Sequence, residues 1–443
     1  MKRSAWRYLF KSEDIRNKLL ITFLLLALYR LAANIPVPNI NLEALRTAQN
    51  ATGAAGNFID LINFLSGGTL ANFSILAMGV YPYITAQIIL QLLVPIIPPL
   101  ERKMKENPRE AQSWMEKWTV ILTIPMALLS AIGQINVFAS LAGTSVIKNF
   151  GFAPDQILGS SAVLLTMVGG TMFGIWLGQL ISEYGIRNQG LSLIIFSGIV
   201  AQIPNSLYRI LVDENNRWVI VVVLAMLVLT IFAIVYVQQG RRNVPVMFPG
   251  RRVGNRMSMP VRSTLPLMVN MAGMIPLIFA QSLLSFPALV ASFFANSDVA
   301  WVKNLATGTM SIFGNGSPWY VLFYFIMVFA FTFFYTSVLF EQQNYGENLK
   351  KQGAQIPGVV RGGPTQRYLS KVQQRITLPG ALFLALVATL PYIATNLLPI
   401  SGRSGLFLLT SSGLLIVVGV VRDTFTIIDT ELKLHGYEDR LIS

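Results

Sequence analysis

The chain contains 443 residues, of which 53% are hydrophobic and only 12% carry a charge, with 34 Lys and Arg against 20 Asp and Glu. Soluble globular chains carry about 25% charged residues, so the composition excludes an ordinary soluble protein. The lack of cysteine excludes disulfides and thiolate metal sites, and the single histidine, His435, excludes a histidine cluster for metal binding or proton transfer.

Apolar blocks of about 20 residues recur along the chain and match the hydrocarbon core of a bilayer, roughly 30 Å thick. They predict an all-α membrane protein, because the strands of a membrane β-barrel are short and alternate apolar with polar residues. We expect ten transmembrane helices, at residues 19–35, 72–94, 114–140, 157–182, 190–211, 216–238, 264–290, 318–341, 378–397 and 406–430.

The first apolar block, residues 19–33, follows a basic segment that lacks a small-residue cleavage site. We therefore expect a retained helix rather than a signal peptide. A second, shorter apolar stretch at residues 58–65 is too short to cross a bilayer, and it predicts a re-entrant segment or half-helix before the second span.

The distribution of Lys and Arg predicts the orientation of the helices. With a cytoplasmic N-terminus and alternating spans, 27 of the 34 basic residues fall on the cytoplasmic side. The other seven lie outside or near outer helix ends: Arg30, Arg46, Lys148, Arg209, Arg217, Lys303 and Arg403. This asymmetry predicts an even number of spans with both termini in the cytoplasm.

Two predicted cytoplasmic loops, at about 239–263 and 342–377, are longer and more basic than a topology signal requires. Long ordered loops are usually functional. A basic, protruding loop suits an RNA surface or an acidic protein partner, and the pattern leaves both open. Basic residues near helix ends also attract anionic lipids.

No acidic residue lies in the middle of a predicted span; Glu183 and Asp423 lie near cytoplasmic helix ends. Ion-coupled transporters usually place ionisable groups at the bilayer midplane, so this pattern argues against that class. The sequence contains neither a phosphate-binding glycine loop followed by Lys-Ser/Thr nor a set of Ser, His and Asp within the spans. We therefore expect neither enzymatic activity nor a cofactor.

Uncharged polar residues do occur within the spans: Thr85, Gln87, Gln91, Gln179, Asn270 and Gln281. They suit either ordinary hydrogen bonds between helices or a helix–helix contact that opens. Ten spans also suggest two halves of five helices, residues 1–211 and 212–443. Because each half has an odd number of spans, the halves would be inverted about an axis in the membrane plane, with a central pore between them.

Motifs along nearly the whole chain then follow one another in a recognisable order. They are residues 30–38 (RLAANIPVP), 64–70 (FLSGGTL), 74–84 (SILAMGVYPYI), 170–178 (GTMFGIWLG), 194–200 (IIFSGIV), 265–276 (LPLMVNMAGMIP), 347–353 (ENLKKQG), 375–381 (RITLPGA) and 414–419 (LLIVVG). In this order and spacing the chain resembles the SecY and Sec61α family of protein-translocase channels.

The resemblance implies an hourglass pore closed at its waist by a ring of apolar side chains. By position this ring maps to Val80, Ile84, Ile88, Leu191, Ile195, Ile275 and Ile416. An apolar constriction dewets and blocks ions, yet forms no specific bond with a passing chain. Three of these residues, Val80, Ile84 and Ile88, also share the i, i+4, i+8 spacing of one helix face.

The resemblance also implies a plug at about residues 58–70 that fills the outer funnel, with Phe58, Leu61, Phe64, Ser66, Gly67 and Gly68 as its candidate residues. Glycines tolerate unusual backbone angles and so suit a segment that moves. A lateral gate toward lipid would lie between the second and third spans and the seventh and eighth, with Thr85 and Asn270 as candidates for its polar contacts.

In the two basic loops, the resemblance implies a docking surface for the ribosome, through its RNA and protein, or for the SecA ATPase. The candidate docking residues are Arg241, Arg242, Arg251, Arg252, Arg256 and Arg361. Further implied partners are SecE, SecG, signal peptides and nascent chains. The family pattern is interrupted twice: residues 185–192 (GIRNQGLS) are one residue longer, which shifts the mapping of Leu191, and residues 359–362 (VVRG) displace Arg361 by one position.

The expected function is therefore the central channel subunit of the Sec translocase in the bacterial plasma membrane. It would conduct unfolded secretory polypeptides outward and release transmembrane segments into lipid. Two other classes stay open from the residues alone. One is a secondary transporter for a small solute, and the other is a membrane scaffold or insertase without a pore.

Overall fold

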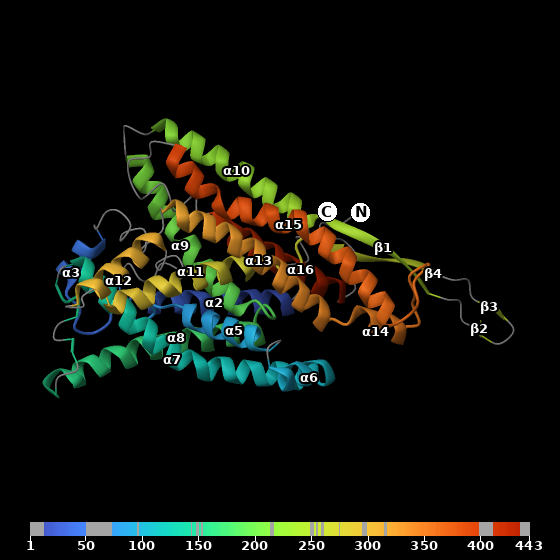
Figure 1. The fold of residues 1–443 in the computed structure, drawn as a ribbon, viewed down its shortest axis with the longest axis horizontal. Helices are drawn as coiled ribbons and strands as arrows, with labels where there is room; N and C mark the ends of the chain where they lie inside the picture. Colours follow the sequence, from blue (N-terminus) through green and yellow to red (C-terminus); the bar gives the residue numbers. More distant parts are fainter. Residues whose placement is uncertain are drawn as a thin grey trace.

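The computed structural model describes residues 13–49, 73–94, 97–142, 144–147, 150–151, 154–212, 217–248, 252–253, 256–257, 261–273, 275–294, 299–313, 317–397 and 411–434. Helices dominate this part of the chain (Figure 1). They are α2 (Glu13–Ala32), α3 (Leu42–Gln49), α5 (Tyr81–Leu93), α6 (Pro98–Glu106), α7 (Pro108–Ala142), α8 (Pro154–Tyr184), α9 (Gly190–Val212), α10 (Arg217–Gln239), α11 (Ile275–Phe294), α12 (Ala300–Ile312), α13 (Pro318–Gln342), α14 (Tyr345–Lys351), α15 (Gly363–Leu397) and α16 (Ser411–Leu434).

Each of the ten predicted spans overlaps one of these helices, so the prediction of an all-α membrane fold is confirmed. Among the described residues, three helical stretches are long and apolar enough to cross a membrane by length and composition: Glu110–Asn136, Gln156–Tyr184 and Pro318–Lys351. Shorter apolar helices lie at Gly190–Ala201, Leu227–Gln239 and Ile275–Ala288.

The second predicted span is helical only in its later part, since α5 begins at Tyr81 and residues 73–80 form turns. Gly79 has a φ of +53°, a left-handed conformation that interrupts a helix, and Pro82 occupies the first turn of α5. The segment before α5 is nevertheless completely buried at Phe73 and Ser74. It pairs with the chain after α2, because the amide of Ile75 donates to the carbonyl oxygen of Ile35 at 2.9 Å.

The predicted loop at 239–263 connects α10 to α11, and most of its described residues form strands, which the sequence pattern did not predict. β1 (Arg241–Phe248) pairs antiparallel with β4 (Val261–Met268), so the seventh predicted span, placed from residue 264, begins inside a strand, and its helix starts at Ile275. The burial of Val244 and Val246, separated by exposed Pro245, shows the period of two expected for a half-buried strand. Two short strands, β2 (Arg252–Val253) and β3 (Arg256–Met257), pair nearby.

The β1–β4 pair, called the ribbon below, extends beyond the helical body in Figure 1. The second predicted loop, 342–377, is also largely ordered: it contains α14 and the beginning of α15. A left-handed residue, Asn344 with a φ of 41°, separates α13 from α14. Apolar side chains of the ribbon, α13, α14 and α15 form one cluster that includes Val244, Phe340 and Leu369.

The largest apolar cluster lies in the helical body and draws on both predicted halves of the chain. Tyr29 of α2 and Leu177 of α8 share it with Leu277 of α11, Tyr324 of α13 and Ile416 of α16. A second cluster joins α7 and α8 to residues 73–78 and to Ala288 of α11. The first of these clusters contains residues near the N-terminal ends of α5, α9, α11 and α16.

Candidate functional site

The residues predicted to form the apolar ring lie in, or pack against, two apolar clusters of the helical body. Val80, Ile84, Leu191, Ile195 and Ile416 all belong to the largest apolar cluster or pack against it. The other two, Ile88 and Ile275, lie in a neighbouring cluster, and Ile84 packs against both. Ile84 packs against both clusters, so the seven residues, contributed by α5, α9, α11 and α16, lie in two adjoining apolar clusters.

Helical geometry fixes the positions of the three ring residues that belong to the second predicted span. Val80 is the residue immediately before α5, and its carbonyl oxygen accepts from the amide of Ile84 at 3.1 Å. The helical spacing thus extends back through Val80, which is 2% exposed, as Ile88 is 4% exposed. Ile89, the next residue along, lies on a different face and is 37% exposed.

Two glycines determine how closely the start of α9, with Leu191, packs against α8. A Cβ added at Gly178 of α8 would lie 2.8 Å from Leu191 Cδ2 and 3.3 Å from Ile194 Cδ1. A Cβ at Gly190 would overlap the Gly178 carbonyl oxygen. Because both positions lack a side chain, the start of α9 packs directly on α8, and Leu191 is partly buried against the main cluster despite the extra residue before it.

The two candidate gate residues make local hydrogen bonds. The Thr85 hydroxyl donates to the carbonyl oxygens of Tyr81 and Pro82, at 3.0 and 2.9 Å, within its own helix. The Asn270 amide both donates to and accepts from the backbone of Gly273, at 3.1 and 3.0 Å, and so closes the turn that leads into α11. Both side chains are buried.

The contact between α5 and the helices α11 and α13 is aromatic and aliphatic, a feature that sequence reasoning missed. The Phe279 ring of α11 lies edge-on to Tyr335 and Phe331 of α13, with centroids 5.6 and 6.2 Å apart. Ile88 of α5 packs into the same cluster. The i, i+4 spacing of Phe331 and Tyr335 was the available sequence signal, but it does not distinguish a gate from ordinary packing.

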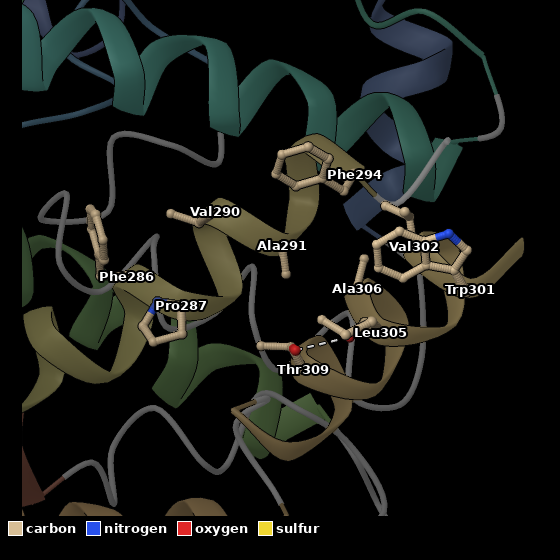
Figure 2. A pocket seen from close by; sticks show the side chains of 10 residues that line it. All are labelled: Phe286, Pro287, Val290, Ala291, Phe294, Trp301, Val302, Leu305, Ala306 and Thr309. Atoms are coloured by element: carbon tan, nitrogen blue, oxygen red, sulfur yellow. Dashed lines mark hydrogen bonds between the residues drawn. The ribbon is translucent and has the colours of Figure 1, made fainter. Parts of the chain in front are cut away.

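An apolar cavity of about 580 Å³ lies apart from this cluster, at the end of α11 (Figure 2). Two helices line it, with Phe286 and Phe294 contributed by α11 and Trp301 and Leu305 by α12 (Figure 2). The Thr309 hydroxyl at its edge donates to the Leu305 carbonyl oxygen at 2.8 Å. None of the seven ring residues lines this cavity.

The described candidate docking residues divide between the ribbon, the β2–β3 pair and the segment after α14. Arg241 and Arg242 begin β1 and are exposed, as is Arg361. Arg252 and Arg256 lie in β2 and β3, paired with Met257 and Val253. Two sets of predicted residues lie outside the described residues: Arg251, and the six plug residues Phe58, Leu61, Phe64, Ser66, Gly67 and Gly68.

Backbone pairing joins the ribbon to the segment after α14 in this candidate docking surface. The amide of Met247 in β1 donates to the Gln355 carbonyl oxygen at 2.8 Å, and the Gln355 amide donates back to the Met247 carbonyl oxygen at 2.9 Å. In the apolar cluster that packs against the ribbon, the ring centroids of Tyr345 and Phe340 lie 5.1 Å apart. The two loops that were predicted separately therefore form one structured surface.

Comparisons with known proteins agree with this arrangement. The sequence model of the SecY family matches residues 74–425. The chain is 36% identical to the protein translocase subunit SecY of Streptomyces scabiei, over 98% of this chain and 99% of that one. It is 37% identical to the subunit of the same name from Aquifex aeolicus, over 97% of each chain.

Solved structures show the same fold. A structure described as a protein conducting channel matches with a TM-score of 0.64 and 18% identity, over 99% of this chain and 100% of that chain. A second, from a study of the plug domain of the SecY protein, matches with a TM-score of 0.63 and 17% identity over the same shares of the two chains. On the family match and the near full-length relatives, the chain belongs to the SecY family.

Proposed function

We propose that the chain is the central channel subunit of a bacterial Sec protein translocase. It conducts unfolded secretory polypeptides across the plasma membrane and releases transmembrane segments sideways into lipid. The observation that carries this proposal is that Val80, Ile84, Leu191, Ile195 and Ile416, from three distant parts of the chain, all lie in one apolar cluster or pack against it. Relatives that span nearly the whole chain carry the name of this subunit, which supports the same function.

The ring chemistry suits a passage for polypeptides of any sequence. Isoleucine, leucine and valine side chains offer neither hydrogen-bond donors nor acceptors, so a moving chain meets no site that holds it. When the passage is empty, the same side chains close on one another and exclude water and ions. The plug, assigned to residues 58–70, adds a second closure on the outer side.

Lateral release requires a helix contact that opens, and the contact of α5 with α11 and α13 is suited to this. It depends on apolar packing around Ile88, Phe279 and Tyr335, which is non-directional. An apolar segment entering between the helices would replace those contacts with similar ones. The halves 1–211 and 212–443 would move apart at this contact, and Thr85 and Asn270 would flank it.

The energy for transport comes from partners, because the channel itself catalyses no covalent step in this proposal. A ribosome or the SecA ATPase docks on the basic surface formed by the ribbon and Arg361, a SecE-like subunit clamps the two halves, and SecG lies at the periphery. Both termini face the cytoplasm, and anionic lipids contact basic helix ends.

Photo-crosslinking tests the path. A crosslinking residue at Ile84 or at Ile275, with a secretory chain stalled in transit through reconstituted membranes, should give adducts to that chain. The same probe at Ile89, exposed on another face of α5, should not. Absence of adducts at both ring positions, while the chain stays bound to the cytoplasmic surface, would show that the path lies elsewhere and would favour a scaffold.

A charge reversal tests the docking surface separately. Replacing Arg251, Arg252 and Arg361 by Glu should weaken binding of ribosomes and of SecA while membrane insertion stays intact. Lys303→Glu in α12, predicted to lie on the outer side, is the control for a charge reversal away from the cytoplasmic surface. Unchanged binding of both partners to the triple variant would remove this assignment.

A further inference from the structure

Gln355 occupies the point where the segment after α14 meets the ribbon. Its neighbours Ala354 and Ile356 are 1% and 4% exposed and belong to the apolar cluster beneath the ribbon. Because successive side chains of an extended segment point to opposite faces, the Gln355 side chain is directed away from that cluster. Its backbone is held by both hydrogen bonds to Met247. The Gln355 side chain therefore extends from a backbone that is hydrogen-bonded to β1.

That side chain binds Arg361. The Gln355 Oε1 atom accepts hydrogen bonds from Arg361 Nε at 3.2 Å and from Arg361 Nη2 at 3.0 Å. Two bonds to one oxygen fix the plane of the guanidinium, which leaves its Nη1–Nη2 edge directed away from Gln355. Glycines with left-handed backbones, Gly358 (φ +80°) and Gly362 (φ +91°), shape the turn that returns Arg361 to Gln355.

We propose that Gln355 is a positioning residue for ribosome docking: it holds the Arg361 guanidinium so that its free edge meets a phosphate of ribosomal RNA. This inference rests on the proposed docking function. A forked guanidinium edge matches two phosphate oxygens. The exposed side chains of Arg241, Arg242 and Arg262 make the neighbouring ribbon basic, which suits a polyanion.

The hydrogen bonds from Arg361 to Gln355 also show how the shifted arginine still lies beside the ribbon. The arginine stands one residue later than the family pattern places it, because two residues, Val359 and Val360, separate it from Gly358 where the pattern has one. Val360 is 73% exposed, so the additional residue is accommodated at the tip of the turn. Gln355 then holds the displaced guanidinium beside the ribbon.

The test uses the complete translocase in lipid nanodiscs, with empty ribosomes as the probe. Gln355→Met keeps the length of the side chain and removes the acceptor, and it should weaken ribosome binding about three- to tenfold. In an Arg361→Lys or Arg361→Ala background the same change should have no further effect. Gln352→Met, at an exposed glutamine in the same segment, is the matched control and should bind normally.

Several outcomes would overturn the positioning role of Gln355. Equal losses from Gln355→Met with and without Arg361 would overturn the positioning role, as would normal binding by Gln355→Met. If Arg361→Ala itself binds ribosomes normally, the docking assignment of Arg361 fails together with this inference. If Gln355→Met weakens SecA binding but not ribosome binding, the phosphate assignment is overturned. Limited proteolysis of residues 352–362 confirms that the variants keep the segment folded.

Discussion

Arg30 and Ser197, 167 residues apart, are joined by the guanidinium of one and the backbone of the other. Arg30 Nε and Nη2 donate to the Ser197 carbonyl oxygen at 3.1 and 2.5 Å, and Nη2 also donates to the Gly198 carbonyl oxygen at 2.8 Å. A charge near the end of a membrane helix is thereby satisfied by backbone dipoles. The contact ties α2 to the turn of α9 that follows the ring residue Ile195.

Removing this guanidinium should loosen α9. We expect Arg30→Met to lower the stability of the purified protein by about 1–3 kcal/mol, because hydrogen bonds to a charged group are lost and the carbonyl oxygens lose their donor. Arg30→Lys should lose less, since it keeps the charge but not the fork. Thermal unfolding in detergent measures both. Arg16→Met, at an exposed arginine of the same helix, is the control, and a loss equal to that of Arg30→Met would contradict the prediction.

Adjacent glycines in α8 provide a matched pair. A Cβ at Gly170 would overlap the carbonyl oxygen of Ile75, in the buried segment that precedes α5, whereas a Cβ at Gly169 would meet nothing within 4 Å. Gly170→Ala should therefore destabilise the protein by about 1–3 kcal/mol through overpacking. Gly169→Ala should leave stability unchanged or raise it slightly, because alanine favours the helix. Similar melting temperatures for the two variants would contradict the prediction and show that residues 73–80 can move to accommodate the added methyl group.

The apolar ring should control ion leakage. Ile84→Asn places an amide at the junction of the two clusters and should let water and ions enter, so liposomes containing the complex should lose a potassium gradient faster than with the wild type. Ile89→Asn makes the same chemical change on another face of α5 and should not leak. Equal leakage from both variants would point to general loosening of α5 rather than to a constriction.

The two ends of the described chain should stabilise each other. Lys18 Nζ lies 3.0 Å from Glu431 Oε1 of α16 and 3.1 Å from Asp14 Oδ2, and the Lys18 and Glu431 side chains are 22% and 16% exposed. Buried Ile15 and Leu432 pack beside this ion pair. Glu431→Gln should cost about 1 kcal/mol of stability. In a double-mutant cycle with Lys18→Met the two losses should not add; simple additivity would mean that the pair contributes nothing.

Hydropathy located the helices well because a bilayer-spanning helix needs a long apolar run, and such runs are visible without any tertiary information. The spacing of Val80, Ile84 and Ile88 likewise predicted one helix face. Residues 73–80 were misassigned as helix because hydropathy records burial and not backbone conformation, whereas the left-handed Gly79 decides the helix start.

Contacts between distant residues were beyond sequence reasoning. Val244 and Val246, two β-branched residues spaced by two, were a weak signal for a strand, but the basic composition around them favoured a loop. The Arg30–Ser197 contact depends on how two helices pack, and the Gln355–Arg361 contact depends on a turn shaped by left-handed glycines. Neither contact can be predicted from a local sequence pattern.

The ribbon has a mechanical consequence. Eight residues in each strand give it a length of about 27 Å, and its paired backbone resists bending. At its base the amide of Val269 donates to the Gly240 carbonyl oxygen at 2.9 Å, which joins the end of α10 to the turn before α11. A load applied at the far end would therefore be carried along the paired backbone to the start of α11, and through the apolar cluster of Val244, Phe340 and Leu369 to α13 and α15.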